Sequence, residues 1–111
     1  MPVKFPEYVS VGIHKYGISY PHPFREATRI FGQCDNCLHE IRISEMDQGG
    51  SRRPDTAILA TFFHELLHAV DSIYMDGRVA GLSDSEKELI ISQFAEGLTQ
   101  AFVNGHFPVV E

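Results

Sequence analysis

The pattern of apolar and polar positions changes once along the chain, near residue 54. Before that point the apolar residues are mostly β-branched or aromatic and occur in short runs between turn residues, which is typical of strands. After it, apolar residues recur at steps of three and four over two long segments, which is typical of amphipathic helices. No period of 20–50 residues repeats. The 111 residues therefore predict one α+β domain spanning residues 1–111.

The first half is predicted to contain three short strands. Residues 8–13 and 17–20 are rich in apolar and aromatic side chains, and we expect a turn near His14–Lys15 to join them. Residues 38–44 alternate between polar and apolar, which makes this segment the clearest strand and places Ile41 and Ile43 on one face. Two further segments are expected to be a short helix (residues 24–31) and a flexible connection (residues 46–53).

The second half is predicted to contain two helices. The first runs from about Asp55 to Met75, and the second begins at Ser83, which forms a capping box with Glu86, and ends at Asn104. Because a loop of about seven residues joins them, we expect antiparallel packing. The expected buried stripes are Leu59, Phe62, Leu66, Val70 and Ile73 in the first helix, and Ile91, Phe94, Ala95, Leu98 and Phe102 in the second.

Charge and cysteine content exclude several classes of protein. Nine Lys and Arg against fifteen Asp and Glu give a net charge of −6, without the basic surface that nucleic-acid and anionic-lipid binders need. The longest charge-free apolar stretch, residues 57–63, is too short to span a bilayer. The first six residues have no signal-peptide pattern, so we expect a cytoplasmic protein in which Cys34 and Cys37 are unpaired thiols. A zinc site at this pair would need two more ligands, and only His39 is close in sequence.

The candidate chemistry lies in the first predicted helix, in the run His64-Glu65-Leu66-Leu67-His68. Histidines four residues apart lie on one helix face and can bind one zinc ion, and the glutamate beside them can take a proton from a zinc-bound water. Chance gives roughly 0.03 occurrences of this pattern in such a chain. With Leu66 at 0°, the apolar stripe is centred near 20° and the histidines lie at about 160° and 200°, away from the core.

A catalytic zinc site needs a third protein ligand, and the second helix offers three glutamates. Glu86 is expected to be occupied in the capping box. With the stripe of this helix at 0°, Glu88 lies at about 60° and Glu96 at about 140°. Glu96 leaves the core face much as the histidines do and lies between two small residues, so we favour Glu96, with Glu88 as the alternative. Asp71, one turn after His68, is either a hydrogen-bond acceptor for a ligand histidine or an exposed helix residue.

The metal motif resembles the signature of the zincin metallopeptidases. Over about residues 30–107 the chain is similar to small phage-type metallopeptidases of the gluzincin kind. The matching segments are Gly32-Gln33 with Asp35, Ile41-Arg42-Ile43, His64-Glu65-Leu66-Leu67-His68-Ala69 and Ala95-Glu96-Gly97-Leu98-Thr99-Gln100. This resemblance implies a minimal zincin-like fold, with a small mixed sheet, an active-site helix and a glutamate helix. It also implies peptide-bond hydrolysis, with His64, His68 and Glu96 as zinc ligands and Glu65 as the catalytic residue.

On this interpretation Glu65 is the general base and later returns its proton to the departing amine. The substrate is a peptide or protein segment, which we expect to lie along residues 38–44 as an added strand. Tyr74 or His106 are candidates to assist, and residues 106–111 are apolar enough to pack on the protein or to cover the site. The alternative is a non-catalytic zinc-binding or interaction module that keeps the motif. The presence of Glu65 favours the enzyme, because a purely structural site needs only its ligands.

Overall fold

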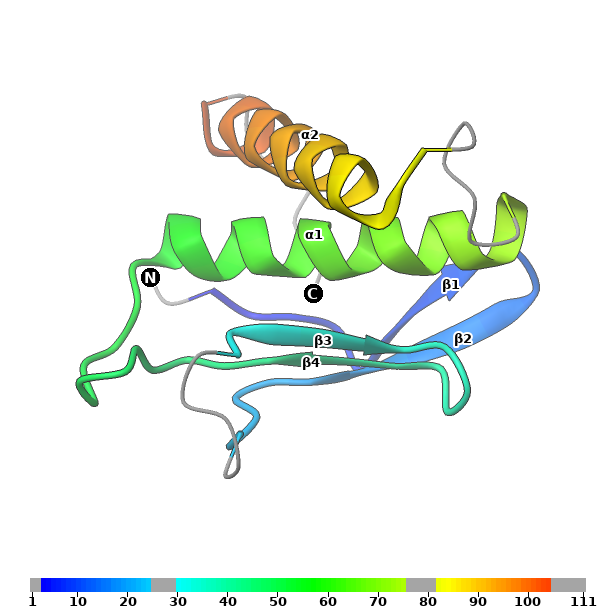
Figure 1. Cartoon of the computed structure of the whole chain (residues 1–111). Helices are drawn as coiled ribbons and strands as arrows, with labels where there is room; N and C mark the ends of the chain where they lie inside the picture. Colours follow the sequence, from blue (N-terminus) through cyan, green and yellow to red (C-terminus); the bar gives the residue numbers. More distant parts are fainter. Residues whose placement is uncertain (1–2, 25–29, 76–81, 105–111) are drawn as a thin grey trace.

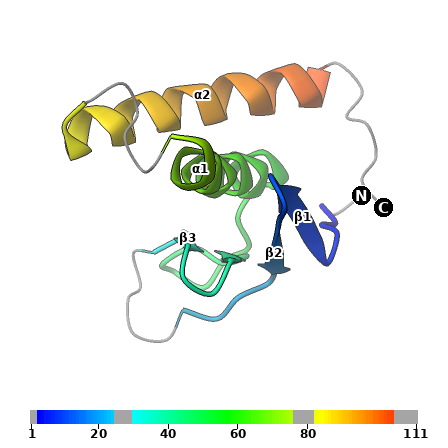
Figure 2. The same cartoon turned by 90° about the vertical axis from the view of Figure 1, so that its right-hand side faces the viewer.

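The computed structural model describes residues 3–24, 30–75 and 82–104. These residues form a small α+β structure with a four-stranded mixed sheet and two helices. In chain order the elements are β1 (Tyr8–Val11), β2 (His14–Ser19), β3 (Gly32–Asp35), β4 (Glu40–Ile43), α1 (Asp55–Tyr74) and α2 (Asp84–Asn104). They are stacked in three layers, with the sheet at one side, α1 in the middle and α2 at the other side (Figures 1 and 2). The predicted α+β class is therefore confirmed.

The sheet has the strand order β1-β2-β4-β3. The outer pairs β1–β2 and β3–β4 are antiparallel, and the central pair β2–β4 is parallel. Three side chains of the sheet in the core shared with α1 are fully buried: Tyr16, Ile41 and Ile43. The prediction that Ile41 and Ile43 share a buried face is thus confirmed.

The first hairpin turns two residues earlier than the sequence predicted. Val11 pairs with His14, so the loop consists of Gly12 and Ile13 and not of the segment around Lys15. A two-residue hairpin loop needs positive φ, and Gly12 adopts φ 63° without a steric penalty.

Strand β4 lies inside the sheet, with β2 on one side and β3 on the other. Both of its edges are therefore occupied, and the expectation that a substrate pairs with residues 38–44 is wrong. The edge strand is β3, a segment that the sequence analysis did not assign to a strand. Phe31 accepts a backbone hydrogen bond from Ser44, at 2.8 Å. Because pairing alternates along an antiparallel ladder, the backbone groups of Gly32 and Cys34 face the other edge of β3, which is free of any strand in the described part of the chain.

Helix α1 has the predicted bounds, and α2 begins after Ser83 as predicted. The Ser83 hydroxyl accepts the backbone N–H of Glu86 at 3.3 Å and donates to its carboxylate at 2.8 Å. The helices do not lie alongside one another as predicted: α2 crosses α1 steeply, since Figure 2 shows α1 nearly end-on and α2 lengthwise. Among the described elements, α2 packs on α1 only.

Three predicted features lie wholly or partly outside the described residues: the short helix at 24–31, the connection at 77–82 and the tail at 105–111. No helix in the described part of the chain combines the length and the apolar content that crossing a membrane requires.

Candidate metal centre

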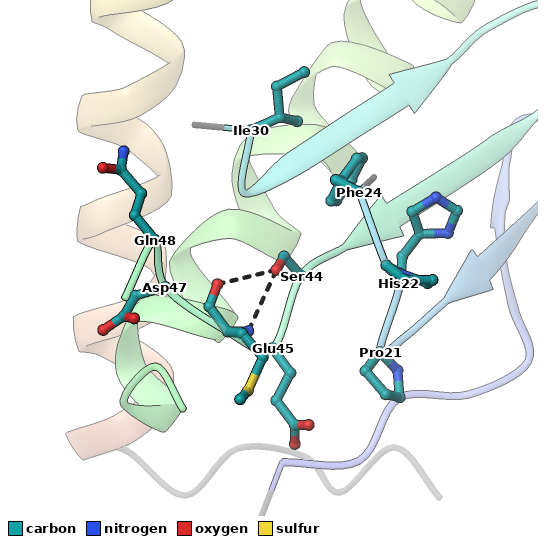
Figure 3. A pocket seen from close by; sticks show the side chains of 10 residues that line it. Pro21, His22, Phe24, Ile30, Ser44, Glu45, Asp47 and Gln48 are labelled. Atoms are coloured by element: carbon teal, nitrogen blue, oxygen red, sulfur yellow. Dashed lines mark hydrogen bonds between the residues drawn. The ribbon is translucent and has the colours of Figure 1, made fainter. Parts of the chain in front are cut away.

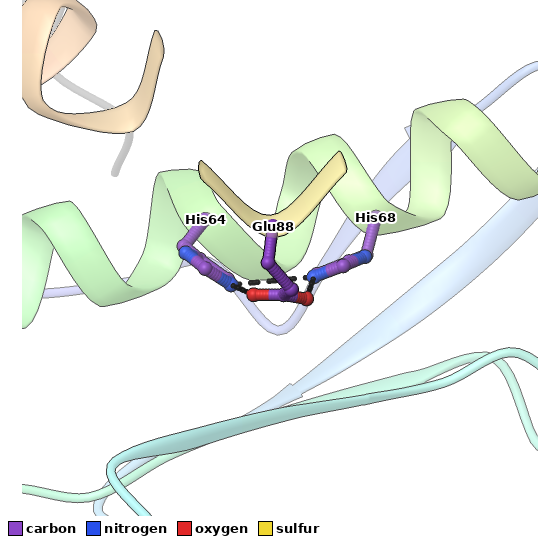
Figure 4. Close-up of side chains that lie close together, drawn as sticks. All are labelled: His64, His68 and Glu88. Carbon is purple, nitrogen blue, oxygen red and sulfur yellow. Dashed lines mark hydrogen bonds and ion pairs between the residues drawn. The ribbon is translucent and has the colours of Figure 1, made fainter. Parts of the chain in front are cut away.

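Two histidines and a glutamate meet where α2 crosses α1 (Figure 4). His64 and His68 lie one turn apart on α1, and their Nε2 atoms are 3.2 Å apart. Glu88, in the second turn of α2, places Oε2 3.1 Å from Nε2 of His64 and Oε1 2.7 Å from Nε2 of His68. Among the described residues these three form a group whose ligand atoms all lie within 4.8 Å of one another.

The donor set and its spacing fit a zinc ion. Two imidazole nitrogens and a carboxylate are the ligands of many catalytic zinc sites. With Zn–N bonds of about 2.0–2.1 Å in a tetrahedral arrangement, two ligand nitrogens lie about 3.3 Å apart, close to the observed separation of 3.2 Å. Three protein ligands leave one position of a tetrahedral ion open to water or substrate.

The structure brings together both predicted histidines but does not bring Glu96 to them. Glu96 is exposed on α2, two turns beyond Glu88, and lines a neighbouring pocket that also includes His64 and Glu65. The residue in contact with the histidines is Glu88, the alternative in the sequence analysis. Glu88 takes this place because the face of α2 that is buried differs from the predicted stripe. The observed buried face lies closer to Glu88 around the helix axis. Its buried residues are Ile91, Ala95 and Thr99.

Glu65 lies beside this cluster, in a pocket that it shares with His64, His68 and Glu88. Only 8% of its surface is exposed. Burial, together with the negative charge of Glu88, raises the pKa of Glu65 to about 7. For His64, burial lowers the pKa, and this effect is opposed by the carboxylate of Glu88.

The raised pKa of Glu65 predicts how stability depends on pH. In metal-free protein, the folded state binds a proton at Glu65 more tightly than the unfolded chain does, so this stabilisation is full below pH 4.5 and lost above about pH 7. The isosteric, neutral variant Glu65→Gln should therefore be more stable than the parent by about 3 kcal/mol at pH 8. It should show little difference near pH 4. Urea unfolding at both pH values measures this, and an equal difference at both would contradict it.

Gly32 of β3 allows the sheet edge to approach Glu65 closely. A Cβ atom at this position would lie 2.4 Å from Cγ2 of Thr61 and 2.9 Å from Oε2 of Glu65. Any side chain at Gly32 would therefore displace α1 from the strand or push Glu65 out of its position.

Gly32→Ala is expected to lower the free energy of unfolding by about 1–3 kcal/mol. A matched control is Gly97→Ala on α2, where nothing lies within 4 Å of the added Cβ. This control should raise stability by roughly 0.5–1 kcal/mol, because alanine loses less entropy than glycine in a helix. Urea titration of the two variants measures the difference, and equal effects would show that Gly32 has room for a side chain.

Ser92 is a site residue that the sequence analysis missed. Its Oγ lies 3.3 Å from Nδ1 of His64, on the side of the ring opposite the cluster. When Nε2 of His64 binds a metal, the ring proton is on Nδ1. The Nδ1–H group then donates a hydrogen bond to Oγ of Ser92, which fixes the orientation of the ring. The only sequence signal for this role is spacing, since Ser92 lies one helical turn after Glu88.

Ser92→Ala is expected to weaken zinc binding by about tenfold, at the lower end of the effect of removing a partner of a metal ligand. The fold should be retained, because the side chain is small and only partly buried. Gln93→Ala, at the next and exposed position, is the control and should leave the affinity unchanged. Competition with a zinc-binding dye measures both, and equal affinities in the two variants would remove the role of Ser92.

Asp71 does not contact the ligand histidines through a hydrogen bond in the described structure. Its carboxylate is buried, and Oδ2 lies 3.4 Å from Nζ of Lys87, the residue before Glu88. Asp71 is therefore one of the groups that hold α2 against α1, and neither of the roles predicted for it applies.

The other described candidates are outside the group of ligand atoms, although Cys34 lines the same pocket. Tyr74 is exposed at the end of α1, where its ring lies next to Gly12. Cys34 and Cys37 are free thiols, and burial raises the pKa of Cys34 to about 12, which disfavours the thiolate that zinc binds. His106 lies outside the described residues.

No family model, no curated protein and no solved structure matches the chain.

A separate pocket lies beyond the end of β4 (Figure 3). It shares Ile30 with the pocket that Glu96 lines. Its lining includes Pro21, His22, Phe24, Ile30 and residues 44–48. His22 is hydrogen-bonded to Ser19 at 2.9 Å, and no residue of the His–Glu cluster reaches this pocket. The pocket around the cluster is therefore the better candidate for chemistry.

Proposed function

We propose that this protein is a zinc-dependent peptidase in which His64, His68 and Glu88 bind the metal and Glu65 is the catalytic base. The observation that supports this most strongly is that the three donor atoms converge in a pocket which also contains a buried carboxylate. A non-catalytic zinc module would not need Glu65, whose burial costs free energy. A zinc ion in this position supplies a Lewis acid and makes a water molecule more acidic.

Each residue then has a defined task. His64 and His68 would hold a zinc ion through Nε2 together with the carboxylate of Glu88, and Ser92 holds the ring of His64. Glu65 accepts a proton from the attacking water and returns it to the leaving amine. Its burial beside Gly32 keeps the carboxylate in one position, so that little reorganisation is needed during the reaction.

The substrate would pair with the free edge of β3. The backbone groups of Gly32 and Cys34 face this edge, and both residues line the pocket of Glu65. An extended peptide added as a strand would thus pass directly beside the metal centre. This arrangement supports a peptide or protein segment without secondary structure as the substrate.

The test is hydrolysis of unstructured peptides by the purified chain loaded with zinc. Cleavage should depend on zinc, be lost after treatment with a chelator and return when zinc is added. A chain that binds zinc stoichiometrically and cleaves no peptide in a diverse library would instead support the non-catalytic module.

A further inference from the structure

The neighbouring pocket that Glu96 lines continues from the metal centre toward the beginning of α1. It has a volume of about 460 Å³ and lies between α1, α2 and the residues leading into β3. His64, Glu65 and Gly32 line both this pocket and that of the cluster. The pocket therefore adjoins the position at which a peptide bond would be attacked, and its side chains are placed to contact the neighbouring residues of a substrate.

Arg53, at the far end of this pocket, is a buried cation that has no carboxylate partner among the described residues. It is 8% exposed, and its guanidinium lies over the ring of Phe31, 4.4 Å from the centroid. Nη1 donates to the carbonyl of Ser44 at 2.9 Å, and Nη2 donates to the carbonyl of Ala57 at 3.1 Å and to Oγ1 of Thr61. All these acceptors are neutral, and within the described residues no Asp or Glu forms an ion pair with Arg53.

Arg53 retains donors for a further group. A guanidinium has five N–H bonds, and the hydrogen bonds above use three of them. The N–H of Nε and the second N–H of Nη1 remain for another acceptor. A buried cation is costly unless it is paired, and a carboxylate that accepts one of these two N–H groups would supply the missing charge.

The position of Arg53 matches a neighbouring residue of the substrate. Arg53 donates to Thr61, which is four residues, or about 6 Å along the helix axis, before Glu65. An extended peptide advances about 3.4 Å per residue. A carboxylate bound at Arg53 would thus belong to the first or second substrate residue on one side of the scissile bond.

Resting on the proposed function, we propose that Arg53 is a specificity-determining residue that binds a substrate carboxylate one or two residues from the scissile bond. The carboxylate is supplied either by an Asp or Glu side chain or by the C-terminus of the substrate. Glu96 lines the same pocket from α2 and is exposed, so its charge opposes an anionic ligand without filling the position at Arg53.

The test measures peptide binding in full-length Glu65→Gln protein loaded with zinc, so that no cleavage is required. Fluorescence anisotropy compares labelled peptides that differ only in Asp against Asn, Glu against Gln, or a free against an amidated C-terminus. The first two pairs detect a side-chain carboxylate, and the third detects the C-terminus. In at least one pair the carboxylate should improve affinity about ten- to hundredfold, the range expected of hydrogen bonds to charged groups.

Variants separate recognition from a structural role of Arg53. In Arg53→Met the discrimination should fall below twofold while the neutral peptide binds as before, and Arg53→Lys should keep part of the preference because it keeps the charge. Glu96→Gln, in the same pocket, should instead tighten binding of the carboxylate peptide by roughly two- to fivefold.

Three results would overturn the proposal: equal affinities within each pair, discrimination that survives in Arg53→Met, or an equal loss for charged and neutral peptides in that variant. Absence of binding by every carboxylate peptide at millimolar concentration would also overturn it. Because the readout is binding to a variant without the base, failure of the parent chain to hydrolyse peptides would reject the proposed function and leave this result standing.

Discussion

The Glu65→Gln variant is expected to bind zinc as tightly as the unaltered chain and to hydrolyse peptides about 10²–10⁴-fold more slowly. The amide has the shape of the carboxylate and fits the same space beside Gly32 and Thr61. It has no basic oxygen that can accept a proton from water, so only proton transfer is lost. Zinc affinity by dye competition and kcat/KM on a fluorogenic peptide separate the two properties.

The control for this experiment is Glu96→Gln, which removes the same charge from an exposed carboxylate in the adjoining pocket. Its rate on a neutral peptide should stay close to that of the parent chain. Full activity of Glu65→Gln would remove the role of Glu65 as the base. Loss of zinc in that variant would instead place its carboxylate among the metal ligands.

The second large effect concerns the choice between Glu88 and Glu96. Glu88→Gln is expected to weaken zinc binding at least about a hundredfold, since loss of an outer partner alone costs 10–100-fold. Glu96→Gln should leave zinc affinity within about twofold, because Glu96 lies outside the group of ligand atoms in the described structure. Isothermal titration at one pH compares the two variants. A larger loss of zinc affinity in Glu96→Gln than in Glu88→Gln would show that Glu96, which the sequence favoured, is the third ligand.

Helix α1 was predictable because one short pattern determines both its structure and the face on which the two histidines lie. Pro54 and Asp55 mark its start, and histidines four residues apart must share a face of any helix. The convergence of His64 and His68 therefore follows from local geometry and did not require knowledge of the tertiary fold.

The third ligand was not predictable in the same way, because it depends on the rotation of α2. Phe94 was assigned to the buried stripe, yet 62% of its surface is exposed, whereas the polar Thr99 is 5% exposed. Thr99 can be buried because its hydroxyl donates to the carbonyl of Ala95 at 2.7 Å. Relative to Ile91 at 0°, the true buried face is centred near 40°, within about 20° of Glu88 and about 100° from Glu96.

Strand β3 and the polar residues of the adjoining pocket were missed for a different reason. Gly32-Gln33-Cys34-Asp35 contains no β-branched or aromatic residue, so its sequence indicates a turn, and pairing with β4 makes it a strand. Arg53 follows Gly49 and Gly50 in a segment that reads as a flexible connection. Its burial arises from acceptors at Ser44, Ala57 and Thr61 that only the folded chain assembles.

Among the described elements α2 packs on α1 alone, and this has a consequence for the order in which parts of the protein unfold. The sheet and α1 share a core, but α2 is held by one packed face, by the ion pair between Asp71 and Lys87, and by Glu88. An ion that bridges Glu88 to the histidines would cross-link the two helices and add its binding free energy to their association. Removal of the metal by a chelator should accordingly accelerate amide hydrogen exchange throughout α2 while the strands keep their protection. The concentration of free metal would then determine how long α2 stays packed on α1.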